Sequence, residues 1–304
     1  MQSIVDAPAP SRIGRAVDRL PPTSYFVVSA VFHYLGPSLA VLLFVHVEAL
    51  GVAWLRIASA AVVFAIWRRP WRIWFGASRG QRVVFVGLGA VLALMNSLFY
   101  LAVERLPLST VGAVEFLGIV VMAAVGARTP RNIAALIVAV AGVAVLTNVR
   151  LSGEPWGFVF AFANCLCFVA YVILGHRIAS TAGPSRSVGT PAGVSMSGID
   201  QLGLSMLIAA VVATPFTAGA AAPAFTHPAW LVWGIGVGIC SSVIPYVTDQ
   251  LAMAKLPRAT FALMLSLLPA VATIIGLLVL QQVPTMFDIL GVALVIAGVA
   301  LHHD

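Results

Sequence analysis

Ten apolar stretches recur along the chain, separated by short polar segments. Most of them have about the length of an α-helix that crosses the hydrocarbon core of a bilayer, roughly 20 residues. They are apolar around most of the helix circumference and lack the alternating polarity of a transmembrane β-strand. The pattern predicts an all-α membrane protein with ten transmembrane helices, at about 25–45, 50–67, 83–103, 108–127, 132–148, 156–176, 199–218, 229–247, 259–280 and 285–302.

The composition excludes a soluble globular protein. Of the 304 residues, 61% are hydrophobic and only 9% are charged, whereas soluble domains carry about 25% charged residues. So few charges do not cover the surface of a soluble fold of this size. The same hydrophobicity excludes a disordered chain, and three cysteines do not make a disulfide framework.

The basic residues predict the direction of the helices. With the N-terminus in the cytoplasm, fourteen of the 17 Lys and Arg fall in cytoplasmic segments, two (Arg105 and Arg150) fall outside, and Arg56 lies within a span. This is the positive-inside pattern. We expect a cytoplasmic tail at 1–24 and both termini in the cytoplasm. The net charge of +7 then reflects topology and lipid contacts rather than nucleic-acid binding.

The first apolar stretch has two interpretations. Basic residues precede it and small residues lie near Ser29 and Ala30, as in a secretory signal peptide. Its apolar run is longer than the usual core of a signal peptide, however. We therefore expect an uncleaved first transmembrane helix.

Two short motifs repeat in the same order in the two halves of the chain. Arg-Leu-Pro-Leu begins at Arg105 and Lys-Leu-Pro-Arg at Lys255, while Ala-Gly-Val-Ala begins at Ala141 and again at Ala297. Each half then holds five helices, so the second half starts on the opposite side of the membrane. Such inverted repeats are common among secondary transporters. The expected repeats are 25–150 and 151–304, with a flexible cytoplasmic linker at about 177–198.

A series of further motifs follows in order through residues 30–300. They are Leu55-Arg56, Pro70-Trp71-Arg72, Asn96 with Leu98-Phe99-Tyr100, Leu106-Pro107, Glu115-Phe116 with Gly118, Ile244-Pro245-Tyr246, Leu256-Pro257-Arg258, Thr260-Phe261 and Pro269. In order and spacing they resemble the drug/metabolite transporter superfamily, in its EamA-type ten-helix branch and closest to the threonine/homoserine exporters. The resemblance implies a secondary transporter that exports a small amino acid or a related metabolite, with proton antiport as one way to drive it.

The chain departs from these exporters at three places. Ile119 stands where they tend to have a Pro, and Leu268 stands where they tend to have a Glu. Gln281-Gln282 stands where a Gly-Glu often occurs. At two of these places the chain therefore lacks an acidic residue that such exporters tend to have.

Arg56 and Glu115 are the main candidates for chemistry. An ionisable side chain inside a membrane is costly, so it marks a candidate functional site. At 1.5 Å per residue, both lie about 10 Å from the same membrane boundary. They can bind the carboxylate and ammonium groups of a zwitterionic substrate, or Glu115 can carry a coupling proton. The alternatives are a structural ion pair between two helices and snorkelling to the interface.

Uncharged polar residues give a second group of candidates. Asn96 and Tyr100 share one face of the third helix, because they are four residues apart, and Tyr246 and Gln250 have the same spacing in the eighth. Each pair can contact substrate or make an interhelical hydrogen bond. Tyr34 lies beside His33 before Gly36-Pro37, a motif that can kink a helix around a cavity. Asp249 is a candidate gate residue or a solvated end residue. Further lining candidates are Asn164, Cys165, Cys167 and Tyr171.

Other kinds of chemistry have no signature in the sequence. It contains no phosphate-binding loop and no Ser-His-Asp or HExxH signature, and no metal site or cofactor is expected. Gly234 and Gly238 form a GxxxG motif, whose simplest interpretation is close helix packing. The alternatives to a carrier are a passive channel and a membrane-embedded enzyme.

Overall fold

The computed structural model describes residues 21–126, 129–148, 154–181, 198–255, 264 and 267–301, and these residues form helices and no strand. The all-α fold expected from the sequence is therefore confirmed. The helices are α2 (Pro22–Leu43), α3 (Ala49–Arg68), α4 (Trp71–Gly76), α5 (Arg79–Val103), α6 (Leu108–Gly126), α7 (Pro130–Asn148), α8 (Pro155–Thr181), α9 (Gly198–Thr217), η1 (Gly219–Ala221), α10 (Ala222–Thr226), α11 (Pro228–Gly238), η2 (Ile239–Val243), α12 (Ile244–Lys255), α14 (Leu268–Leu280) and α15 (Met286–Leu301).

Most of these helices coincide with the apolar stretches of the sequence. Within the described residues, six helical segments are long and apolar enough to cross a membrane: Thr23–Leu43, Ala49–Arg68, Arg79–Val103, Pro155–Gly175, Gly198–Thr217 and Pro228–Asp249. Four further apolar helical segments are shorter: Leu108–Gly118, Pro130–Leu146, Leu268–Leu280 and Met286–Leu301. The chain is therefore a multi-pass membrane protein.

Residues at the helix ends explain where several helices start and stop. Proline occupies the first turn of α2 and of α11, where its missing N–H costs no hydrogen bond. Ser78 and Gln81 form a capping box at the start of α5: the Ser78 N–H donates to Gln81 Oε1 at 2.9 Å, and the Gln81 N–H donates to Ser78 Oγ. Arg69 ends α3 in the left-handed region, with φ of 51°.

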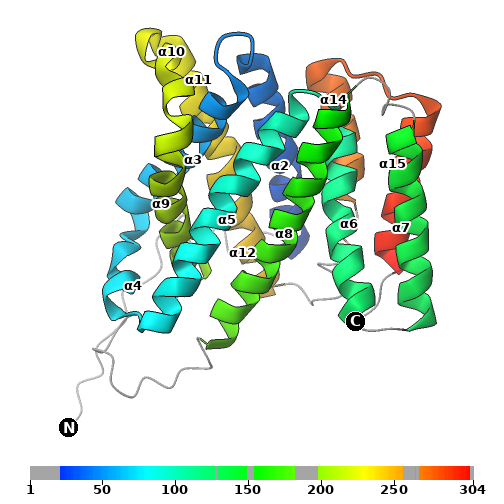
Figure 1. The fold of residues 1–304 in the computed structure, drawn as a ribbon, viewed down its shortest axis with the longest axis horizontal. Coiled ribbons are helices and arrows are strands. Elements are labelled where there is room, and N and C mark those ends of the chain that lie inside the picture. Colours follow the sequence, from blue (N-terminus) through cyan, green and yellow to red (C-terminus); the bar gives the residue numbers. More distant parts are fainter. Residues whose placement is uncertain are drawn as a thin grey trace.

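The helices α7 and α15 make the most extensive contact in the molecule, and Figure 1 shows them side by side at one end of it. Glycines allow their backbones to approach closely. A Cβ built at Gly142 would come within 2.7 Å of the Gly291 carbonyl oxygen, and one at Gly298 within 2.8 Å of the Ala135 oxygen. Gly142 and Gly298 are the glycines of the repeated Ala-Gly-Val-Ala motif. The motif therefore supplies a packing seam between the two halves of the sequence.

A second close contact joins α3 to the segment α11–η2. A Cβ at Gly234 would overlap the side chain of Leu55, and one at Gly238 would overlap Ser59 Oγ and come within 2.8 Å of the Arg56 carbonyl oxygen. The expectation that the GxxxG motif mediates close helix packing is confirmed. This contact matters for the site because it brings the backbone of η2 against the turn of α3 that carries Arg56.

The remaining interhelical contacts in the described part of the structure link early helices to late ones and also join sequence neighbours such as α6 and α7. Figure 1 shows α3, α4 and α9 at the end of the molecule opposite α7 and α15, with α2, α5, α8 and α12 between them. Besides α7–α15 and α3–α11, the main packed pairs are α5–α8, α5–α9, α3–α9, α2–α12, α6–α7, α6–α8, α2–α14, α6–α14 and α3–α5.

Three features differ from the expected pattern. The eighth apolar stretch, expected as one helix at 229–247, is divided into α11, the π-helical segment η2 and α12, and continues to Lys255. The short helices α4 and α10 were not expected. Residues 177–181, expected in a linker, continue α8, and α9 begins at Gly198. Residues 182–197, the rest of that linker, lie outside the described residues, as do the tail at 1–20 and most of 256–266.

Candidate functional site

Arg56 is buried within the helical bundle, with 6% of its surface exposed. It lies in α3, and its Nε donates to Ser242 Oγ at 2.9 Å while its Nη2 donates to the backbone oxygen of Ser241 at 3.1 Å. Both acceptors belong to η2. The Arg56 Cζ also lies 5.5 Å from the centre of the Tyr100 ring in α5, a cation–π distance. The guanidinium is thus held by partners that carry no net charge.

Glu115 lies in α6 and is 7% exposed. Its carboxylate is close enough to Arg56 for electrostatic attraction, and it also lies near the Tyr34 hydroxyl of α2 and the Asn164 amide of α8. Among the described residues, ion pairs within 4.0 Å join Arg68 to Asp200 and Arg105 to Glu104. None joins Arg56 to Glu115. The two opposite charges therefore share one buried region without a direct ion pair.

Several polar groups around these charges have no hydrogen-bond partner in the described structure. They are the Tyr34 and Tyr100 hydroxyls and the Asn164 amide oxygen, all of them fully shielded, while the Asn164 amide nitrogen faces the Glu115 carboxylate. A buried polar group without a partner costs about 1–3 kcal/mol. Their unused hydrogen-bonding capacity makes them candidate contacts for a ligand. We call Tyr34, Arg56, Tyr100, Glu115 and Asn164 the central polar cluster.

A second set of polar side chains continues from this cluster along α12. The Tyr246 hydroxyl lies close to the Arg56 guanidinium, and Asp249 lies close to Tyr246 and to Tyr171 of α8. Asp249 also faces the Ser29 hydroxyl of α2. Polar groups therefore extend from Arg56 toward the C-terminal end of α12, where sequence analysis gave Asp249 as a candidate gate residue.

The structure brings together some of the candidate site residues and not others. Tyr34, Arg56, Tyr100, Glu115 and Tyr246 lie around one region. Asn96 is buried in α5, but its Nδ2 donates to the Leu92 oxygen of the same helix at 2.7 Å. The side chain of Gln250 lies outside the described part of the structure.

The sequence did not single out Ser241, Ser242 or Asn164 as part of this site. Ser241 and Ser242, the partners of Arg56, were not named at all, and Asn164 was only one of several lining candidates. A signal for the serines exists in retrospect: two adjacent hydroxyl residues interrupt an apolar stretch three residues before Pro245. No comparable signal places the Asn164 amide beside Glu115, because this contact joins two helices distant in sequence.

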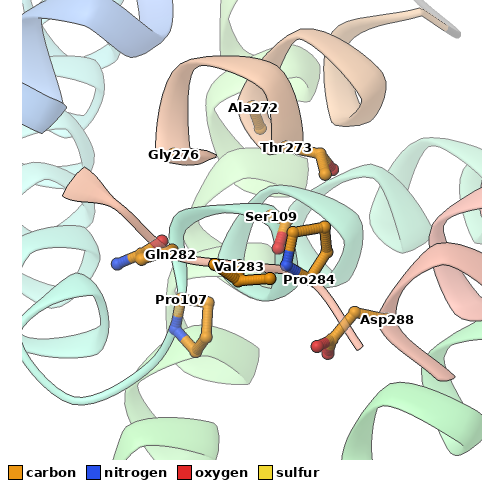
Figure 2. A pocket seen from close by; sticks show the side chains of 9 residues that line it. All are labelled: Pro107, Ser109, Ala272, Thr273, Gly276, Gln282, Val283, Pro284 and Asp288. Carbon is orange, nitrogen blue, oxygen red and sulfur yellow. The ribbon is translucent and has the colours of Figure 1, made fainter. Parts of the chain in front are cut away.

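A small cavity lies apart from the cluster, between α14, the start of α6 and the segment 282–284 (Figure 2). It measures about 20 Å³, enough for a water molecule but too small for an amino acid. Its polar side chains have structural partners. Gln282 Oε1 accepts from the Leu108 N–H at 3.2 Å, and Asp288 caps α15 by accepting from the Thr285 N–H at 2.9 Å. This cavity is therefore not a candidate substrate site.

Charged groups buried between packed membrane helices, without a reactive constellation, are typical of a membrane transport protein. Known proteins agree with this class. The EamA-like transporter family matches residues 155–302. Over 270 residues the chain is 30% identical to the threonine/homoserine exporter RhtA of Escherichia coli (strain K12) and to that of Salmonella typhimurium (strain LT2), covering 86% of this chain and 84% of each relative.

The chain belongs to the EamA-like transporter family. A crystal structure of a protein with 18% sequence identity aligns with a TM-score of 0.54, covering 92% of this chain and 96% of that one, so the two share a fold. The family and the relatives are transporters rather than enzymes, in line with the expectation from the sequence.

Proposed function

We propose that this protein is a secondary transporter that exports a small amino acid of the threonine/homoserine kind, or a related metabolite, across the bacterial inner membrane. Substrate binds at the central polar cluster, between residues 25–150 and residues 151–304. Both termini face the cytoplasm. Proton entry is the proposed source of energy.

The observation that carries this proposal is the pair of opposite charges in the cluster. Arg56 and Glu115 are both buried, and no direct ion pair neutralises them. A free amino acid at neutral pH carries one carboxylate and one ammonium group. Arg56 is suited to the carboxylate because its planar guanidinium has several donors, and Glu115 is suited to the ammonium. An amino acid therefore complements the site with both of its charges.

The packing of the helices supports two inverted five-helix repeats. In the proposed repeat, α2 is equivalent to α8, α3 to α9, α5 to α11–η2–α12, α6 to α14 and α7 to α15. When each helix is exchanged with its equivalent, the packed pairs map onto other packed pairs. The pair α5–α8 maps onto the contact of α2 with α12, α5–α9 onto α3–α11, and α6–α8 onto α2–α14. The pairs α3–α9, α6–α14 and α7–α15 map onto themselves. This is the relation expected when two inverted copies enclose a site between them.

The relatives support the class of substrate. Those that align over most of their length are threonine/homoserine exporters by name. Of the residues that carry the resemblance, Arg56, Tyr100 and Glu115 lie in the cluster. The positions where the exporters tend to have further acidic residues, Leu268 and Gln281-Gln282, lie in α14 and after it. These two departures therefore fall outside the central polar cluster.

The decisive experiment is export by cells that overproduce the protein, compared with the Glu115→Gln variant. We expect raised extracellular threonine or homoserine with the wild type, and a reduction of about tenfold or more with the variant, because the amide no longer pairs with the substrate ammonium group. The matched control is Glu104→Gln, an exposed glutamate paired with Arg105 outside the cluster, which should export normally. Normal export by a correctly inserted Glu115→Gln protein would contradict the site.

Proton coupling needs a separate measurement. In proteoliposomes loaded with threonine, antiport predicts that an imposed proton gradient accelerates efflux and that efflux moves protons in the opposite direction. Saturable counterflow without any proton movement would remove the antiport step but leave the carrier. Efflux that neither saturates nor shows counterflow would indicate a passive channel instead.

A further inference from the structure

Asn164 is a buried polar side chain of the central polar cluster. The proposed binding of the substrate's charged groups by Arg56 and Glu115 gives Asn164 no role. It lies in α8 with none of its surface exposed; its amide oxygen has no hydrogen-bond partner, while its amide nitrogen faces the Glu115 carboxylate as a donor. Its carboxamide lies close to the Glu115 carboxylate. Tight packing fixes this position, because a Cβ at Gly118 of α6 would come within 2.9 Å of the Cys165 sulfur, one residue from Asn164.

The chemistry of this amide matches a hydroxyl group. A carboxamide both donates and accepts hydrogen bonds, and so does an alcohol. A substrate whose ammonium group lies against Glu115 places its side chain nearby, since the side chain and the ammonium group leave the same carbon. In threonine the hydroxyl is on the next carbon, and in homoserine on the one after it. Both hydroxyls are therefore within reach of an amide that adjoins the carboxylate.

We propose that Asn164 determines specificity by hydrogen-bonding the side-chain hydroxyl of the substrate. This inference rests on the proposed function, because it requires that an amino acid binds at Glu115. It adds a substrate feature that the two charges cannot distinguish, since every amino acid carries the same ammonium and carboxylate groups. A site built to bond a hydroxyl discriminates against an analogue without one, because its own polar groups then remain unpaired.

One ligand gives a sharp test because it is the deoxy analogue of both substrates. Removing the hydroxyl from threonine or from homoserine gives 2-aminobutyrate. Competition against radiolabelled threonine on the purified protein measures the affinity ratio of threonine to 2-aminobutyrate. Valine, in which a methyl group replaces the threonine hydroxyl, serves as a second comparison of nearly equal size. For the wild type we expect a ratio of about 10 to 100 in favour of threonine, from the cost of the unpaired amide.

The informative variants are Asn164→Leu, which keeps the shape of the side chain but removes both polar atoms, and Asn164→Ala. We expect the ratio to fall to about 1 for both variants, with the affinity for 2-aminobutyrate and valine kept or increased. The matched control is Asn132→Leu, which removes another buried asparagine, in α7 and outside the cluster. It should keep the wild-type ratio. Size-exclusion profiles and thermal melting of the detergent-solubilised variants establish that each is folded.

Two results would overturn the inference. An unchanged ratio in folded Asn164→Leu and Asn164→Ala proteins would show that the hydroxyl is bound elsewhere. An equal loss of affinity for all three ligands would show that Asn164 only positions Glu115. Failure of the proposed function is distinguishable from both, because in that case the wild type itself binds none of the three amino acids.

Discussion

Arg56 illustrates how a single residue connects fold and function in this protein. Its side chain reaches from α3 to η2, where one nitrogen bonds the Ser242 hydroxyl and another bonds the Ser241 carbonyl. Two donors aimed in fixed directions are a property of guanidinium that an ammonium group does not reproduce. The identity of the residue therefore matters beyond its positive charge.

We predict that Arg56→Lys lowers threonine export by about tenfold while the protein still inserts and folds, because lysine keeps the charge but loses the bidentate geometry. Arg105→Lys is the control. Arg105 lies outside the cluster, where it pairs with Glu104 and bonds the Leu101 oxygen at 2.9 Å. Export at wild-type rates by the Arg56→Lys protein would mean that only the charge is needed.

A residue of the site could be predicted from the sequence only where its type is rare within the apolar stretches. Arg56 and Glu115 stand out because charged residues inside apolar stretches are few. Asn164 and Ser242 do not stand out, because uncharged polar residues are common in such helices and most bond their own backbone, as Asn96 does to Leu92. Which polar residue faces a neighbouring helix depends on tertiary contacts that no local pattern encodes.

At the scale of the elements, the segment α11–η2 depends on small residues for its position against α3. Gly238 and Gly236 are two residues apart but meet different surroundings. A Cβ at Gly238 would overlap Ser59 Oγ, whereas a Cβ at Gly236 meets nothing within 4 Å. The two glycines therefore separate a packing effect from the general effect of glycine on a helix.

We predict opposite effects of alanine at these two positions on the thermal stability of the purified protein. Gly238→Ala should destabilise it by about 1–3 kcal/mol, because the added methyl forces α11 away from α3. Gly236→Ala should be neutral or stabilising by up to about 1 kcal/mol, since alanine favours a helix and the space is open. A Gly238→Ala protein as stable as the wild type would show that α11 and α3 can separate enough to hold the added methyl group at little cost in free energy.

The elements themselves were largely predictable, because apolar length alone specifies a spanning helix in a chain of this composition. The exceptions have local causes. The helix α4 is only six residues long and follows Pro70, so it has no spanning apolar run that would reveal it. The π-helical hydrogen bonding of η2 is set by how Ile239–Val243 fits against α2 and α3, which apolar periodicity does not report.

At the scale of the whole molecule, contacts between early and late helices make the two halves one structure. The seam of α7 with α15 and the contact of α3 with α11 both join residues 25–150 to residues 151–304. The central polar cluster lies between these two parts of the chain, since Arg56 of α3 bonds Ser241 and Ser242 of η2. Its position fits a mechanism in which the halves move against each other around a fixed site.

We predict the topology that this mechanism requires. Alkaline phosphatase, which is active only outside the cytoplasm, should be active when fused after residue 104 or residue 152. It should be inactive when fused after residue 128 or residue 190, because those connections carry the basic residues retained in the cytoplasm. A green fluorescent protein fused after residue 304 should fluoresce. An active phosphatase after residue 190 would contradict the inverted arrangement of the halves.

The π-helical segment η2 also affects how the two halves of this chain are compared as sequences. A π-helical turn holds one residue more than an α-helical turn, so it acts as a one-residue insertion whose flanking helix keeps its course. If the third and eighth spans are equivalent, as proposed, their alignment needs a one-residue gap at Ile239–Val243. An ungapped alignment fixed on the Leu-Pro motifs that follow α5 and α12 then matches every residue of α11 one position away from its equivalent, which is about 100° around the helix. The proposed relation between the two halves is thus clearer in their helix contacts than in an ungapped comparison of their sequences.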